Sequence, residues 1–383
     1  MFGGDSSGVQ DRLRNVQHIQ ASYAAFAALL ADGSVVTWGN AGYGGNCSSV
    51  QDRLRDVRRI QASSRAFAAI LGDGSVVTWG HAGCGGDSSA VQDQLKDVRH
   101  IQASRGAFAA ILGDGSVVTW GEVDAGGSSK AVQDQLTSVK EIQASQDAFA
   151  ALRDDGAVVA WGHDLCGGDS HSVQPRLKKV QQVSASSAAF AALLADGSVV
   201  AWGNAAYFGD SNAMQDRLKD VQQIRAAENA FAAVRGDGAV VCWGDTESDG
   251  NRIALEDELK NVTQIQASER AFAALRGDAS VVTWGDSGYG GDCSSVQDRL
   301  RDVQCIQASG RAFAAILGDG SVVTWGHAGC GGDSSAVQDQ LKDVRHIQAS
   351  RGAFAAILGD GSVVTWGNSD YGGSSASAFK GGN

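Results

Sequence analysis

The hydrophobic pattern of this chain repeats every 41 residues. Tryptophans mark the period from Trp38 to Trp366, and a phenylalanine lies twelve residues before each of them, from Phe26 to Phe354. Each repeat therefore has its own pair of aromatic residues for a core. A fixed period without insertions indicates one repeat domain over residues 1–383 rather than two or three unrelated domains.

Three segments of each repeat have the pattern of β-strands. In the repeat 80–120, Ile101 and Ala103 alternate with polar residues, as in a half-buried strand. Residues 107–112 form a nearly continuous apolar run, and residues 117–120 are β-branched and aromatic. These two segments are predicted to be strands that are buried on both faces.

A hairpin is predicted between the second and third strands. Asp114 and Gly115 stand there, and eight of the nine repeats have the same Asp-Gly dipeptide, a strong hairpin signal. In the seventh repeat Asp278 is followed by Ala279, so the freedom of glycine at positive φ is lost.

The segment 88–95 leaves two interpretations open. It is either a short outer strand or a helical turn that begins with a capping box of Ser89 and Gln92. The helical turn is favoured. Because both interpretations stay open, three to four strands are expected per repeat.

The predicted fold is all-β, a β-propeller of nine 41-residue repeats. An open array needs terminal caps, but the two ends, around residues 3–7 and 372–375, have the same phase of the repeat and no visible cap. The first repeat is therefore expected to close onto the ninth. Because propellers usually have four to eight blades, an open spiral of the same blades is the alternative, and a parallel β-solenoid comes third.

Charge and composition narrow the classes of partner. The net charge of −12 and a pI near 5.0 argue against a nucleic-acid partner. No stretch approaches the roughly 20 apolar residues of a membrane span, and no signal peptide is seen, so a cytoplasmic protein without membrane insertion is expected. The seven cysteines recur at a few repeat positions, and there is no Cys-x-x-Cys motif. This pattern is better explained by copying of the repeat than by disulfide pairing, and it favours a reducing compartment.

The repeat resembles that of the regulator of chromosome condensation family. The resemblance rests on the alanine-rich strand, the Asp-Gly turn, the Val-Val-Thr-Trp-Gly segment and the glycine-rich loop, and it covers the whole chain. The short period is most similar to the compact branch that includes the propeller-type β-lactamase-inhibitory protein. The resemblance implies a propeller that presents one face to a protein partner.

Departures from the family narrow what the resemblance implies. The family has Gly-x-x-His before the middle strand, but this chain has Ser-x-x-Ala, as in Ser104 to Ala107. Guanine-nucleotide exchange on a small GTPase is therefore only a distant alternative. Among the residues of the turn before the middle strand, only Tyr23 is aromatic. Neither β-lactamase inhibition nor tryptophan-based photoreception is therefore expected.

No enzyme, cofactor or metal site is expected. The histidines fall mainly on two repeat positions, and equivalent positions on different blades should not converge on a metal. The hairpin aspartates and Asp87 are explained by turn chemistry.

Residues 65–121 are identical to residues 311–367, six periods apart, which indicates growth by duplication. The expected function is a non-catalytic protein-interaction scaffold; the alternative is a structural subunit of a larger assembly.

Two groups of residues are predicted to contact a protein partner. In residues 245–258 the glycine and serine elements of the loop are replaced and the local charge is −5. A drifting, solvated loop is the slightly favoured interpretation, and the alternative is an acidic patch that suits a basic partner. The acidic group is Asp245, Glu247, Asp249, Glu256, Asp257 and Glu258. The second group is basic and precedes the phenylalanine strand: Arg65, Arg105, Arg270, Arg311 and Arg351.

Overall fold

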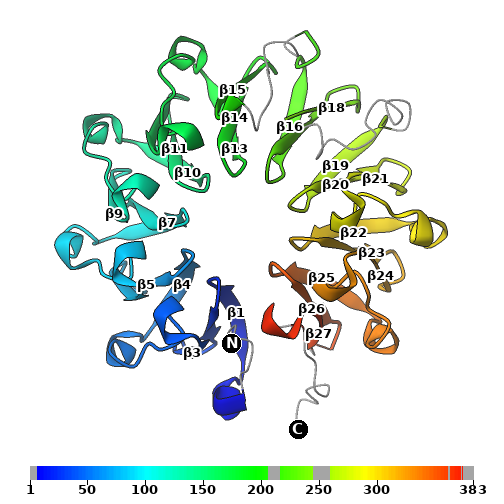
Figure 1. Cartoon of the computed structure of the whole chain (residues 1–383), viewed down its shortest axis with the longest axis horizontal. Coiled ribbons are helices and arrows are strands. Elements are labelled where there is room, and N and C mark those ends of the chain that lie inside the picture. Colours follow the sequence, from blue (N-terminus) through cyan, green and yellow to red (C-terminus); the bar gives the residue numbers. More distant parts are fainter. Residues whose placement is uncertain (1–6, 206–215, 245–258, 361–362, 372, 374–383) are drawn as a thin grey trace. The chain divides into compact units, whose positions relative to one another are not determined.

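The structure is a computed structural model that describes residues 7–205, 216–244, 259–360, 363–371 and 373. Within these residues the chain forms nine antiparallel sheets, each made of three consecutive strands in chain order. Each sheet is one blade in Figure 1. The fold is therefore all-β with propeller-type blades, as the sequence predicted, and each described blade has three strands.

The strands of successive blades are β1 (Val16–Ala21), β2 (Ala25–Leu30), β3 (Val35–Gly39); β4 (Val57–Ala62), β5 (Ala66–Leu71), β6 (Val76–Gly80); β7 (Val98–Ala103), β8 (Ala107–Leu112), β9 (Val117–Gly121); β10 (Val139–Ala144), β11 (Ala148–Arg153), β12 (Val158–Gly162); β13 (Val180–Ala185), β14 (Ala189–Leu194), β15 (Val199–Gly203); β16 (Val221–Ala226), β17 (Ala230–Arg235), β18 (Val240–Gly244); β19 (Val262–Ala267), β20 (Ala271–Arg276), β21 (Val281–Gly285); β22 (Val303–Ala308), β23 (Ala312–Leu317), β24 (Val322–Gly326); β25 (Val344–Ala349), β26 (Ala353–Leu358) and β27 (Val363–Gly367).

Short 3-10 helices lie in the connections between blades, before the first strand and after the last strand. They are η1 (Ser7–Arg12), η2 (Ala41–Tyr43), η3 (Gln51–Arg53), η4 (Ala82–Cys84), η5 (Ser89–Val91), η6 (Val123–Ala125), η7 (Gln133–Gln135), η8 (Asp164–Cys166), η9 (Gln174–Arg176), η11 (Ser287–Tyr289), η12 (Ser294–Arg299), η13 (Ala328–Cys330), η14 (Gln338–Gln340) and η15 (Ser369–Tyr371). None of the helices in the described residues is long and apolar enough to span a membrane.

The helical turn predicted for residues 88–95 is confirmed, but the capping box predicted for it is wrong. Helix η5 has no side-chain cap. Gln92 instead donates from Nε2 to the carbonyl oxygen of Val76 at 3.0 Å and accepts from the Ser88 hydroxyl at 3.0 Å. The side chain of Gln92 is thus used to tie the turn to the third strand of the preceding blade. Asp87 accepts from the Ser89 amide at 2.9 Å, the turn chemistry that the sequence indicated.

The chain divides into two compact units. The first unit comprises residues 1–195 and 200–204, and the second comprises residues 196–199 and 205–383. Within the first unit, Figure 1 shows consecutive blades side by side, with their first strands on a common inner side.

A bulge in the first strand of each blade sets which side chains face the core. In blade 2 the register between β4 and β5 shifts between Val57 and Arg59, so Arg58 is the extra residue. The bulge places Val57 and Ile60, three positions apart, on the same buried face, and both are less than 5% exposed. Arg58 and Arg59 are exposed.

Each core lies between two consecutive blades. The phenylalanine and tryptophan of every blade stack with ring centroids 5.1–5.3 Å apart. In blade 2 this pair, Phe67 and Trp79, packs with Ala25, Ala27 and Leu29 of blade 1. The small side chains of the alanine-rich strand leave room for the aromatic rings, which explains why both residue types keep the same period.

The predicted burial of the tryptophans is confirmed for eight of the nine. From Trp79 to Trp366 they are at most 4% exposed, whereas Trp38 in the first blade is half-buried. The indole Nε1 of Trp79 donates to the carbonyl oxygen of Gly44 in the preceding blade at 3.0 Å, and five other tryptophans make the same bond. For Trp243 and Trp284, no partner is found in the described part of the chain.

The hairpin glycines combine a left-handed backbone with a close contact to the next blade. Gly33 has a φ of +78°, and a Cβ there would lie 2.9 Å from the Cα of Asp56. Its carbonyl oxygen accepts from the amide of Val57 at 2.9 Å. Ala279 occupies the same place in blade 7 with a φ of +62°. The alanine that breaks the Asp-Gly pattern therefore adopts a left-handed backbone conformation, which is unfavourable for a residue with a Cβ.

Replacing Ala279 with glycine is expected to raise the free energy of unfolding by about 0.5–1 kcal/mol. A left-handed conformation costs a non-glycine residue about 1–2 kcal/mol, and this gain exceeds the entropy cost of glycine, about 0.5–1 kcal/mol. Urea denaturation measures the change. The matched control is Gly320→Ala in blade 8, where φ is +77° and the effect should have the opposite sign. A loss of stability in Ala279→Gly would contradict this account of the turn.

Candidate functional site

The turn between the first and second strands of each blade presents two residues on a common frame. In blade 3 the hydroxyl of Ser104 accepts from the amide of Ala107 at 3.1 Å and donates to the carbonyl oxygen of Ala125 at 2.7 Å. These bonds fix the ends of the turn and leave Arg105 and Gly106 at its tip. The same serine position is kept in every blade except the sixth, which has Ala227.

Backbone hydrogen bonds join the turns of consecutive blades within each unit. The amide of Ser64 donates to the carbonyl oxygen of Arg105 at 3.0 Å, and the amide of Arg105 donates to that of Gln146 at 2.8 Å. In the second unit the amide of Glu269 donates to the carbonyl oxygen of Gly310 at 2.9 Å. We name this set the turn ladder; its residues are 23–24, 64–65, 105–106, 146–147 and 187–188 in the first unit, and 228–229, 269–270, 310–311 and 351–352 in the second.

Three of the predicted arginines form ion pairs along the turn ladder. Arg105 bonds Asp147 of the next blade through Nε at 2.9 Å. Arg270 pairs with Glu228 of the preceding blade at 3.5 Å. Arg351 reaches Glu269, two blades away, at 2.8 Å. The Cα of Gly310 lies between them, and a Cβ there would come within 2.9 Å of the Glu269 carboxylate, so the absence of a side chain leaves room for this pair.

The other two predicted arginines contact tyrosine rings. The guanidinium of Arg65 lies 4.7 Å from the ring centroid of Tyr43. That of Arg311 lies 4.4 Å from the ring centroid of Tyr289 and donates to its hydroxyl. The guanidinium of Arg270 also lies near the Tyr289 ring, 5.4 Å from its centroid. The arginines are thus held in place by neighbours, which lowers the entropy that a partner would have to remove on binding.

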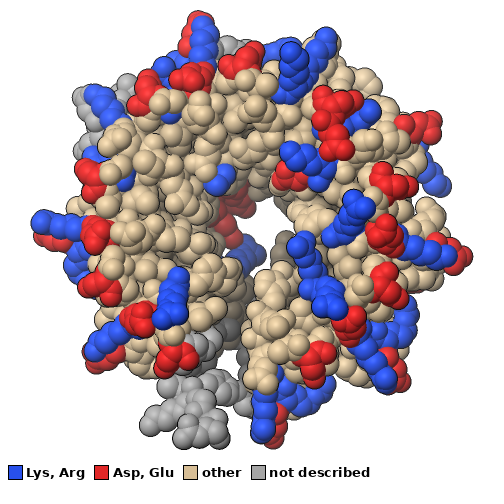
Figure 2. Space-filling model, turned by 180° about the vertical axis from the view of Figure 1, so that it is seen from behind, with Lys and Arg blue, Asp and Glu red and all other residues tan. Residues whose placement is uncertain are grey.

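Acidic and basic side chains are mixed at the surface rather than separated. On the face drawn in Figure 2, blue and red side chains lie in close pairs with uncharged surface between them. Each unit's part of the turn ladder has the same mixture. Asp147 pairs with Arg105 in the first unit, and Glu228 and Glu269 pair with arginines of the second unit. A partner at this surface would therefore meet both signs of charge. The predicted acidic group Asp245, Glu247, Asp249, Glu256, Asp257 and Glu258 lies outside the described residues.

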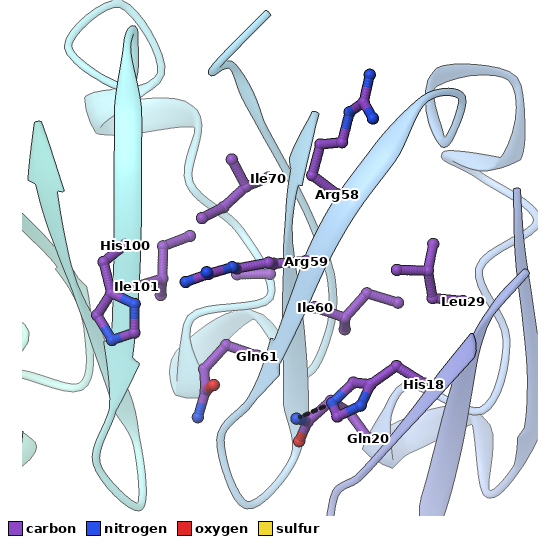
Figure 3. A pocket seen from close by; sticks show the side chains of 11 residues that line it. His18, Gln20, Leu29, Arg58, Arg59, Ile60, Gln61, Ile70, His100 and Ile101 are labelled. Carbon is purple, nitrogen blue, oxygen red and sulfur yellow. Dashed lines mark hydrogen bonds between the residues drawn. The ribbon is translucent and has the colours of Figure 1, made fainter. Parts of the chain in front are cut away.

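A cavity that the sequence analysis missed lies at the first strands of blades 1, 2 and 3. Its volume is about 320 Å³, and it is lined by His18, Arg58, Arg59 and His100 together with glutamine and aliphatic residues of β1, β2, β4, β5 and β7. Figure 3 shows these side chains from close by. Histidines at equivalent repeat positions were predicted to point apart, but the side chains of His18 and His100 line one cavity. Burial lowers the pKa of His100, and the charge of Arg59 lowers it further.

The described residues contain no group of three or more His, Cys, Asp or Glu side chains that could hold a metal ion. None of the seven cysteines, all of which lie in the described residues, forms a disulfide. Burial raises the pKa of Cys84, Cys166 and Cys330, which occupy equivalent repeat positions. These thiols are therefore less ionised than an exposed cysteine at neutral pH.

Comparison with solved structures finds chains of similar fold at low sequence identity. No protein-family model matches the chain, and no curated protein sequence matches it. Among solved structures, the chain is similar to the ectodomain of the Physcomitrella patens receptor kinase CR4, with 15% identity, a TM-score of 0.42 and coverage of 71% of this chain and 74% of that chain. It is similar to human WBSCR16, with 17% identity, a TM-score of 0.40 and coverage of 61% and 81%. It is also similar to Prp20p from Saccharomyces cerevisiae, a protein studied for binding to Gsp1p and histones, with 17% identity, a TM-score of 0.42 and coverage of 73% of both chains.

Proposed function

We propose that this chain is a non-catalytic protein-binding module of the regulator of chromosome condensation type, and that the turn ladder is its contact surface. The observation that carries the proposal is that the turn residues vary from blade to blade while the strands that hold the turns stay nearly the same. The nine turns have eight different residue pairs, and only blades 3 and 9 share one. Strand residues on both sides of the turns are nearly constant. Binding surfaces commonly combine variable loop residues with a rigid scaffold in this way.

The distribution of exposed apolar residues supports a binding module over an architectural subunit. A subunit that is buried in an assembly needs a wide apolar rim. The exposed large apolar side chains of the described residues are instead few and lie in separate elements: Val16 and Ile19 in β1, Tyr23 in the turn after it, Val123 in η6, Leu165 in η8 and Ile357 in β26.

Replacing the charged turn residues is the direct test of this function. Blade 5 has the uncharged pair Ser187 and Ala188 in the same turn, so each charged residue can take the residue of blade 5 without a change of frame. The variant combines Arg65→Ala, Arg105→Ser, Asp147→Ala, Glu228→Ser, Glu269→Ser, Arg270→Ala, Arg311→Ala and Arg351→Ser. We expect it to capture at least about tenfold less partner from native extract, because buried charged contacts are each worth about 1.5–3 kcal/mol.

A second variant separates the turn ladder from the predicted acidic group. Exchanging residues 245–258 for residues 327–340 of blade 8 reduces the local charge from −5 to −2 and keeps the length. If the turn ladder is the contact surface, this exchange lowers capture less than the turn variant does, and mainly at low salt, where charge steering is strong. Undiminished capture by a folded turn variant would overturn the proposed surface.

A further inference from the structure

The cavity at the first strands of blades 1–3 combines an apolar floor with a basic rim. Leu29, Ile60, Ile70 and Ile101 supply aliphatic side chains to its lining. The basic residues come from the bulged part of β4 and from the equivalent parts of β1 and β7. This part of each first strand lies near the hairpin end of the blade, at the opposite end of the strand from the turn ladder. The cavity is therefore separate from the surface discussed above.

The basic side chains of the cavity differ in whether they already have a partner within the chain. Arg58 pairs with Asp56 at 2.9 Å, and in Figure 3 its side chain points away from the other lining residues. The Nε2 of His18 lies 2.8 Å from the side-chain amide of Gln20. Arg59 extends toward His100 in Figure 3, and no ion pair is found for it among the described residues. Arg59 thus places an exposed, uncompensated positive charge beside an apolar cavity.

The chain contains an internal comparison for this cavity, six repeats further on. Eight of its eleven lining residues recur unchanged 246 positions later, including His346 and Ile347 in place of His100 and Ile101. The three that differ are the other basic or titratable ones: His18, Arg58 and Arg59 correspond to Gln264, Gln304 and Cys305.

The fold of the strand does not require these charges. Strand β22, which contains Gln304 and Cys305, has the same length as β4 and the same bulge. The positions of Arg58 and Arg59 are also uncharged in blades 5 and 6, where both are glutamine. The basic rim in blades 1–3 is therefore an addition to a strand that folds without it, and it needs an explanation other than stability.

We propose that this cavity binds an acidic peptide segment, with a carboxylate between Arg59 and His100 and an adjacent aliphatic side chain on the apolar floor. A guanidinium offers a carboxylate two parallel N–H donors, and Gln61 offers a further amide donor from the same strand. A cavity of about 320 Å³ holds a few side-chain groups rather than a folded domain. The aliphatic floor favours a peptide over a bare anion, which has no apolar part to bury.

The affinity for such a peptide should rise as the pH falls. Arg59 faces His100 from β4 and disfavours its charged form, whereas Glu141 from β10 and a hydrogen bond with Gln102 favour it. Burial outweighs these two, so the pKa of free His100 is lowered and the ring is neutral at pH 7. A bound carboxylate stabilises the charged ring and raises its pKa in the complex. Binding therefore takes up a proton, and affinity falls with increasing pH between the free and the bound pKa.

The test is a titration of the full chain, labelled with ¹³C at the histidine rings, followed by NMR at about pH 7.5 and about pH 5.5. The probes are a blocked Gly-Leu-Glu-Leu-Gly peptide, its Glu→Gln analogue and inorganic phosphate. We expect the glutamate peptide to shift the His100 signal and to bind about tenfold more tightly than the analogue, the value of one charge-assisted contact. The affinity should be higher at the lower pH, with a raised pKa for His100 in the complex.

Two variants taken from the chain's own repeats make the result specific. Arg59→Gln installs the residue of blades 5, 6 and 7 and should weaken the glutamate peptide about tenfold or more. Gln264→His with Gln304→Arg and Cys305→Arg rebuilds the rim at the second copy and should add a second site with a shift at His346. The eight-residue turn variant should bind the peptide normally, so failure of the proposed function leaves this result unaffected.

Several outcomes would overturn the proposal. Equal binding of the glutamate peptide and its analogue would exclude the carboxylate as the recognised group. Unchanged binding by a folded Arg59→Gln variant would place the peptide elsewhere. Phosphate binding without peptide binding would assign the cavity to another class of anion, and the absence of any shift at His100 would remove the site.

Discussion

Replacing Trp202 with alanine is expected to lower the free energy of unfolding by about 3–5 kcal/mol, the usual cost of removing a large buried aromatic side chain. Trp202 is 3% exposed and stacks on Phe190 with ring centroids 5.3 Å apart. Its Nε1 donates to the carbonyl oxygen of Gly167 at 3.0 Å. The substitution therefore leaves a cavity between two blades and an unpaired carbonyl. Urea denaturation followed by circular dichroism measures the loss.

Phenylalanine substitutions separate packing from hydrogen bonding. Trp202→Phe removes the indole N–H and part of the ring, whereas Trp243→Phe removes an indole N–H that has no partner in the described residues. The first should cost about 1 kcal/mol more than the second, the net value of one buried hydrogen bond. If Trp202→Ala left stability unchanged and abolished partner capture, the structural role assigned to the tryptophans would be wrong.

Replacing Gly85 with alanine is expected to cost about 2–4 kcal/mol, because two penalties combine there. The φ of Gly85 is +89°, which disfavours any residue with a Cβ, and that Cβ would lie 2.4 Å from Cδ2 of Phe108. Phe108 is fully buried and stacked on Trp120, so its ring cannot move aside. The carbonyl oxygen of Gly85 is also the acceptor for the Trp120 indole.

The matched control for Gly85→Ala is two residues away in the same loop. A Cβ at Gly83 would meet only the exposed ring of His81, at 3.3 Å, and its φ is not in the left-handed region. Gly83→Ala should therefore change the urea midpoint little. Equal effects of the two substitutions would mean that the loop relaxes and that the contact with Phe108 does not set its sequence.

The strands and their cores were predictable because each repeats with the same period. The apolar run 107–112 and the segment 117–120 became β8 and β9, and the hairpin between them formed as the Asp-Gly signal indicated. The bulge in the first strand was not predictable from alternation, since it brings Val98 and Ile101, an odd number of positions apart, to one face. Closure of the first repeat onto the ninth stays a prediction.

The candidate site was predictable only in part, because its contacts join different repeats. The sequence could place Arg105 and Arg351 in turns, but their acidic partners are 42 and 82 residues away. Their pairing depends on how consecutive turns are hydrogen bonded, which no local pattern reports. The cavity draws His18, Arg59 and His100 from three blades, and only a comparison of repeats six periods apart marks these residues as unusual.

Site-specific photo-crosslinking from the two ends of one blade tests most directly whether the turn ladder is the protein-binding surface. Gln146 lies in the turn between β10 and β11, and Asp154 lies in the hairpin at the other end of β11; both are exposed. A photoreactive phenylalanine analogue at position 146 should give a crosslinked partner in native extract, and the same group at position 154 should give none. Adducts from position 154 alone, or equal adducts from both ends, would contradict the assignment.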